Sequence, residues 1–138
     1  MIMASIVLVV SVCLLVQFFV SYCRVQVAAG RRVDLSESAR EATGIQRGQG
    51  VSGEEFLRLR KLAELCPETN GDTYKLGAIR AYHAFLGMIQ TMFGPVIPAA
   101  AAWATNERSG CSYYAAVALD ARIAHTRQIL QHDFLGQQ

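Results

Sequence analysis

An uninterrupted apolar run opens the chain. Residues 1–22 carry no charged side chain, and Gln17 is the only strongly polar residue among them. As a helix rising ~1.5 Å per residue, such a run crosses roughly the 30 Å hydrocarbon core of a bilayer. A run of this length predicts a transmembrane helix rather than a helix in a soluble core, and we assign the first transmembrane helix to residues 1–23.

A secretory signal peptide is the alternative for this run, since residues 27–29, Val-Ala-Ala, offer small side chains to a peptidase. However, no Lys or Arg precedes the run, which is also longer than a usual signal h-region. We therefore favour an uncleaved anchor. Because Arg24, Arg31 and Arg32 follow it, the positive-inside rule places the N-terminus outside or in the lumen, with the Arg-bearing loop on the cytoplasmic, stromal or matrix side.

A polar, glycine-punctuated region follows, and we assign residues 24–79 to a connecting loop. The part from Arg32 to Gly53 has no period of 2 or 3.6 and predicts an extended loop. Ser52 and Glu55 form a capping-box pattern, which predicts a short soluble helix over 53–66. Pro67 and the pair Asn70-Gly71 end it. Its expected apolar face is Phe56, Leu59, Leu62 or Ala63, and Cys66.

A second uncharged run covers residues 84–105 and predicts a second transmembrane helix. Asp72 or Thr73 can cap the helix that leads into it. Pro95 and Pro98 interrupt the run, and prolines in a membrane helix predict a kink. Small residues recur at helical spacing along one side, where they would let a neighbouring membrane helix approach closely. The predicted helix-packing residues are Ala84, Gly87, Thr91 and Gly94.

A last helix is expected over residues 111–135, after a polar turn at 106–110. It begins with nine apolar residues and then carries Asp120, Arg122 and His125. Charge inside a membrane is costly, so two interpretations remain open: a third transmembrane helix with an internal polar face, or an amphipathic helix along the membrane surface. The predicted fold class is thus an all-α membrane protein, with residues 1–138 forming one membrane domain.

Composition narrows the functional classes. The chain is 52% hydrophobic and 17% charged, and its net charge of +2 is too small to indicate nucleic-acid binding. The four cysteines form no CxxC pair, and whether Cys66 pairs with Cys111 is not determined by sequence. The pattern predicts neither a catalytic triad nor a metal site. His83 or His125 could ligate a pigment or haem, but a packed histidine is the favoured interpretation.

Three short motifs resemble those of MAPEG proteins, the membrane-associated proteins of eicosanoid and glutathione metabolism. They are Gly30-Arg31-Arg32, Arg80-Ala81-Tyr82, and the segment 121–126, Ala-Arg-Ile-Ala-His-Thr. The resemblance implies membrane helices that form a trimer and bind glutathione between subunits.

Under this resemblance, Arg31, Arg80, Arg122 and either Tyr113 or Tyr114 would serve the glutathione chemistry. The chain departs from the family where Ala84 and Gly87 replace the expected Asn and Glu. Only a dozen residues follow Thr126, too few for a fourth membrane helix.

The leading functional hypothesis is a small non-catalytic accessory subunit of a larger membrane complex, such as an energy-transducing complex. Its partners would be membrane lipids and other transmembrane subunits. A glutathione-dependent MAPEG-like enzyme, or a homotrimer that binds lipid or thiol, is the alternative. The residues expected to contact anions or lipid headgroups are Arg24, Arg31, Arg32, Arg80, Arg122 and His125.

Overall fold

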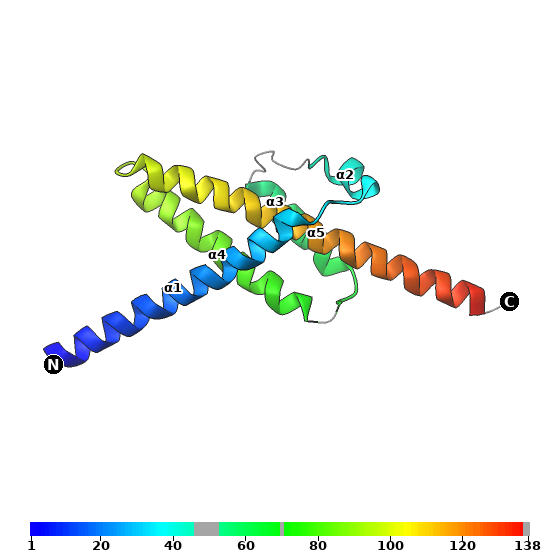
Figure 1. Ribbon diagram of the computed structural model, residues 1–138. Helices are drawn as coiled ribbons and strands as arrows, with labels where there is room; N and C mark the ends of the chain where they lie inside the picture. The colour runs from blue at the N-terminus through cyan, green and yellow to red at the C-terminus, as the bar shows by residue number, and fades with distance from the viewer. Residues whose placement is uncertain (46–52, 70, 137–138) are drawn as a thin grey trace.

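The computed structural model describes residues 1–45, 53–69 and 71–136, and these residues form α-helices joined by short connections (Figure 1). The helices are α1 (Ile2–Arg32), α2 (Glu37–Thr43), α3 (Gly53–Leu65), α4 (Asp72–Phe93) and α5 (Pro98–Gly136). No strand occurs in the described part, so the prediction of an all-α chain is confirmed.

The long helix α5 is the element against which all the others pack. Its buried residues Ala104, Ala115 and Ala116 are almost fully covered, and small side chains of this kind let neighbouring helices approach closely. Phe56 of α3 and Tyr82 of α4 are the largest fully buried side chains. The core therefore lies where α1, α3 and α4 meet the middle of α5.

Helix α1 has two parts with different surroundings. Residues 1–18 are exposed throughout, whereas Cys23, Val27 and Gly30 are buried against the rest of the chain. Among the described residues, α1 is the helix long and apolar enough to cross a membrane. It is longer than the predicted 1–23, because its last turns pack on α5 as part of the helical domain.

The structure does not confirm a second transmembrane helix over 84–105. Helix α4 ends at Phe93, residues 94–97 form a turn, and α5 begins at Pro98, so the uncharged run is folded into an antiparallel hairpin (Figure 1). Pro95 and Pro98 lack the N–H groups that a continuous helix requires, and Pro98 stands at the first helical position, where proline is favoured. The prolines therefore produce a turn rather than the predicted kink.

The expected last helix also differs from the structure. The polar residues 106–110 lie inside α5 rather than in a turn, because Arg31 donates a hydrogen bond to the Asn106 carbonyl (2.8 Å) and Glu107 is buried beside Tyr82. Partners on α1 and α4 thus bind polar groups of residues 106 and 107, in a segment whose sequence predicts a turn. Beyond residue 123, α5 projects from the domain, with mostly exposed side chains.

Much of the predicted loop 24–79 is helical. Residues 24–32 continue α1, the short α2 lies within the expected extended segment, and α4 already begins at Asp72. Ser36 caps α2 and also donates a hydrogen bond to Asp120 of α5 (2.6 Å), which explains why the polar segment is ordered there. The predicted capping residue Ser52 lies outside the described residues.

Helix α3 occupies 53–65, where the pattern predicts helix over 53–66, and Phe56, Leu59 and Ala63 form its buried face. Leu62 is exposed, so Ala63 is the alternative that the packing selects. Helix α4 starts with Gly71 at the N-cap position and without a side-chain cap, in contrast to the predicted capping by Asp72 or Thr73. Asp72 instead faces Arg122 of α5, at 3.2 Å.

Candidate functional site

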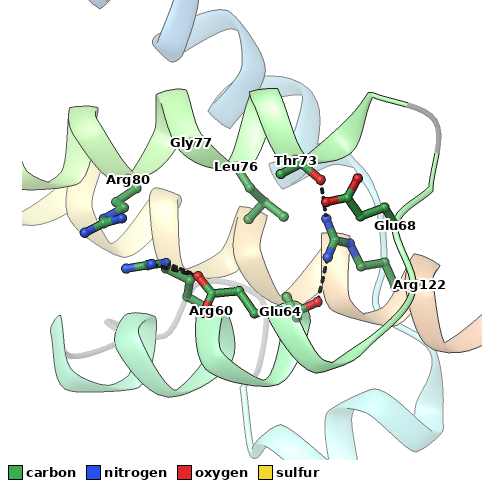
Figure 2. Close-up of a pocket in the computed structure, with 9 residues that line it drawn as sticks. Arg60, Glu64, Glu68, Thr73, Leu76, Gly77, Arg80 and Arg122 are labelled. Atoms are coloured by element: carbon green, nitrogen blue, oxygen red, sulfur yellow. Dashed lines mark hydrogen bonds and ion pairs between the residues drawn. The ribbon is translucent and has the colours of Figure 1, made fainter.

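A cavity of about 260 Å³ between α3 and α4 is lined by arginines from three different helices (Figure 2). Arg60 comes from α3, Arg80 from α4 and Arg122 from α5. Two of these, Arg80 and Arg122, are among the residues expected to contact anions. The wall also includes Ala63, Glu64, Glu68, Thr73, Leu76 and Gly77.

Arg122 forms the buried base of this cavity. Its guanidinium pairs with Asp72 (Nε–Oδ2, 3.2 Å), donates to the Ala63 carbonyl (2.6 Å) and reaches the Thr73 hydroxyl (3.5 Å). Only 3% of the residue is exposed. A buried guanidinium needs such partners, because an unpaired charge in the interior is strongly unfavourable. Arg122 therefore has a structural role, because its bonds join α5 to the end of α3 and the start of α4.

Arg60 and Arg80 are less buried than Arg122. Arg60 pairs with Glu64 one turn further along α3 (2.7 Å), and Arg80 is exposed. Their guanidinium groups lie on the same side of the cavity in Figure 2, where Glu64 is bonded to Arg60, whereas Glu68 lies near Arg122 and Thr73. Cations and carboxylates together suit a small ligand that carries both charges, whereas a purely anionic ligand would also face the glutamates.

The other residues expected to contact anions are not brought together here. Arg24 lies near Glu107 (3.9 Å), Arg31 binds the Asn106 carbonyl, Arg32 is exposed at the end of α1, and His125 is partly buried on α5. Arg31 thus has a structural contact between α1 and α5. The set that the MAPEG resemblance implies is divided, since Arg80 and Arg122 line the cavity and Arg31 does not.

The predicted stripe of small residues is also divided. Ala84 and Thr91 are exposed, whereas Gly87 and Gly94 face α5 within the hairpin. A Cβ on Gly87 would lie 3.7 Å from the guanidinium carbon of Arg108, so any longer side chain would displace that group. Two of the four residues therefore serve the chain's own packing rather than a free surface.

The hairpin contains a polar cluster that sequence analysis missed. Arg108 of α5 donates to the side-chain oxygen of Gln90 (2.8 Å) and to Nε2 of His83 (3.3 Å), and the His83 ring stacks on Phe56 at 4.2 Å. The Gln90 amide donates in turn to the hydroxyl of Thr105 (3.2 Å). The signal that could have predicted this cluster is the pair Gly94-Pro95. Interpreted as the turn of a hairpin rather than as a kink, it places Gln90 opposite Thr105.

The remaining candidate groups have structural partners. The Tyr113 hydroxyl donates to the Val33 carbonyl (2.8 Å), and burial raises the pKa of the Tyr114 hydroxyl, which keeps it protonated. Cys66 and Cys111 are both free thiols. In the described part of the chain, no three His, Cys, Asp or Glu side chains are placed to hold a metal ion.

Comparison of the chain with protein-family models, with curated proteins and with solved structures finds no match.

Proposed function

We propose that this chain is a small non-catalytic subunit of a larger membrane complex, with α1 as its anchor. The observation that carries the proposal is the exposure of residues 1–18, a long apolar surface that no other described helix covers. Exposed apolar surface of this size is stable in lipid or against another apolar helix. The arginines that follow the apolar run favour an orientation with the helical domain on the cytoplasmic, stromal or matrix side.

The proposed docking surface for other transmembrane subunits is the outer face of α4. Ala84 and Thr91 are exposed there and are separated by two helical turns, so they lie on one side of the helix. Small residues at this spacing let a partner helix approach closely. Gly87 and Gly94 are no longer part of this surface, because they face α5.

Affinity capture of the full chain from its native membrane, in a mild detergent, tests the docking proposal. Ala84→Leu and Thr91→Leu should each reduce the amount of co-purifying membrane subunits, with the helical content of the chain unchanged. Leu57→Ala on α3 is a control, because Leu57 is exposed but lies outside the proposed surface. If both α4 variants retain the partners of the wild type, the docking surface is wrong.

The arginine cavity favours a second candidate function, the binding of glutathione or a similar zwitterionic thiol. Glutathione carries two carboxylates and one ammonium group. The arginines of the cavity could pair with the carboxylates, and its glutamates could pair with the ammonium group. Titration calorimetry of the chain in detergent with glutathione tests this candidate. Arg80→Gln should weaken binding, since Arg80 is exposed at the cavity, and absence of heat with the wild type would exclude it.

A further inference from the structure

Two segments of the chain that lack Asp, Glu, Lys and Arg are bounded by residues that lie close together in the fold. The first is residues 1–23, which ends at Arg24, and the second is residues 81–106, which lies between Arg80 and Glu107. In the fold, Arg24 lies 3.9 Å from Glu107, and the Cys23 thiol contacts the Ala78 carbonyl at 3.8 Å. Arg24 and Glu107, which bound the two segments, thus lie together where α1, α4 and α5 cross, whereas Arg80 lines the arginine cavity.

The two segments also extend from this crossing toward the same side. In Figure 1, the N-terminus of α1 and the turn between α4 and α5 lie on the left, and the C-terminus of α5 lies on the right. The uncharged residues 1–23 and 81–106 thus extend from one side of the crossing, as expected of segments that enter a membrane. The Arg108 guanidinium accompanies them between the arms of the hairpin, where it donates to Gln90 and His83 and is therefore paired inside the protein.

The surface of the uncharged end of the hairpin, residues 81–106, is apolar at its tip. Large apolar side chains are exposed at the end of α4 and in the turn: Met88, Met92, Phe93, Val96 and Ile97. In water, such a group of side chains would be an unfavourable patch. Because α1 continues directly from the same crossing into its exposed apolar part, the lipid around α1 is the nearest apolar medium that can cover this patch.

The N–H groups of the turn meet a strict requirement of lipid, which is that backbone polar groups have partners within the protein. Pro95 has no N–H, and the N–H groups of Gly94, Val96 and Ile97 donate to the carbonyls of Gln90 and Phe93 at 2.7–3.1 Å. The polar side chains on the arms are bonded within the hairpin as well. Thr91 and Thr105 donate to carbonyls of their own helices (2.9 Å each), and Gln90 bridges to Thr105.

We propose that the uncharged end of the hairpin, residues 81–106, is embedded as a re-entrant element in the leaflet next to the helical domain. At 1.5 Å per residue, the 13 residues of α4 beyond Arg80 reach about 20 Å, and the nine residues of α5 before Glu107 reach about 13 Å. The hydrocarbon core is about 30 Å thick, so the tip ends near its middle. This inference rests on the proposed function, because it assumes that α1 spans the same bilayer.

The single tryptophan of the chain, Trp103, lies on the α5 arm of this element and provides a native probe. The full-length chain is reconstituted into phosphatidylcholine vesicles whose acyl chains are brominated either near the headgroup or near the bilayer centre. We expect loss of Trp103 emission, stronger with bromine near the headgroup, because Trp103 lies only one helical turn from Glu107. Emission that neither lipid quenches, from protein that floats with the vesicles, would overturn the proposal.

Moving the probe tests the depth. Trp103→Phe combined with Phe93→Trp places the tryptophan at the tip, and the stronger quenching should shift to lipid brominated near the bilayer centre. Stronger quenching near the headgroup would overturn the re-entrant arrangement in favour of a hairpin that crosses the bilayer or lies on its surface. Trp103→Phe with Phe134→Trp is the matched control, because Phe134 is exposed on the opposite end of α5, and its emission should be unaffected.

The same samples separate this proposal from the function on which it rests. If the chain does not float with the vesicles at high salt, α1 is not a membrane anchor, and both proposals fail. If it floats but Trp103 and the tip probe stay unquenched, only the embedded hairpin is wrong.

Discussion

The replacement of Arg122 by methionine is the most informative single test of how the helical domain is held together. Methionine keeps a similar length and apolar stem but removes the guanidinium, which bonds to Asp72, to the Ala63 carbonyl and to Thr73. Breaking a buried ion pair by removing one partner typically costs about 3–5 kcal/mol. The Asp72 side chain is 20% exposed, so water compensates part of this loss. We expect Arg122→Met to lower the free energy of unfolding by about 3 kcal/mol.

Urea unfolding in detergent micelles, followed by far-ultraviolet circular dichroism, measures this effect. The matched control is Arg60→Met, which also breaks an arginine–carboxylate pair. In this case the two partners lie one turn apart on the same helix. The side chains of that pair, Arg60 and Glu64, are 27% and 57% exposed. Exposed pairs of this kind contribute only about 0.3–0.5 kcal/mol, so the control should unfold almost like the wild type.

A double-mutant cycle with Asp72→Asn isolates the ion pair from the other contacts of Arg122. Residues in direct contact show coupling energies of about 0.5–3 kcal/mol, and we expect a value in this range for the pair. Equal and small shifts in Arg122→Met and Arg60→Met would refute the argument, because the guanidinium would then not be the link between α3, α4 and α5.

Three further predictions concern other contacts. Gly110→Val should lower the free energy of unfolding by about 1–3 kcal/mol in the same urea assay, because a Cβ at Gly110 would lie 2.6 Å from Val27 on α1. Gly77→Ala has open space around it and should raise the free energy of unfolding by up to about 1 kcal/mol, because alanine favours the helix more than glycine does. Ser36→Ala should cost about 1 kcal/mol, since it removes both the cap of α2 and a bond to Asp120, and a change below the error of the unfolding curve would contradict it. Burial raises the pKa of the Cys111 thiol from 9.0 to about 12, so a maleimide should label Cys66 in the folded chain and Cys111 only after unfolding. The free energy of unfolding should also fall as the pH rises above about 9, because the Cys111 thiol then loses its proton more readily in the unfolded chain.

The outline of the fold could be predicted from the sequence wherever one helix face or one apolar run dominates. The apolar run at residues 1–22 predicts α1 up to its contact with α5, and the spacing of Phe56, Leu59 and Ala63 predicts the buried face of α3. Both signals are local, because they depend on side chains within a few turns of one another.

The hairpin could not be predicted in the same way, because its turn competes with a proline kink that has the same local sequence. The outcome depends on distant contacts, such as those of Arg108 with Gln90 and His83, which stabilise two antiparallel arms over one long helix. The same reason explains the polar residues 106–110, which are helical only because α1 and α4 supply partners.

The candidate site could be predicted in part. The sequence indicates Arg80 and Arg122 as anion contacts, and both line the cavity together with Arg60, which is absent from the predicted set. Arg31 and Gly87 have structural contacts that short motifs cannot reveal. Local sequence identifies which side chains carry charge, whereas the crossing of the helices decides which of them share a cavity.

The most direct measurement of the proposed role is the native mass of the assembly that contains this chain after gentle extraction from its own membrane. A subunit of a larger complex predicts a heteromeric mass that includes at least one other transmembrane chain and that decreases in the Ala84→Leu variant. A mass equal to the chain alone, or to three copies of it, would contradict the accessory-subunit proposal, and the trimer would favour the glutathione alternative instead.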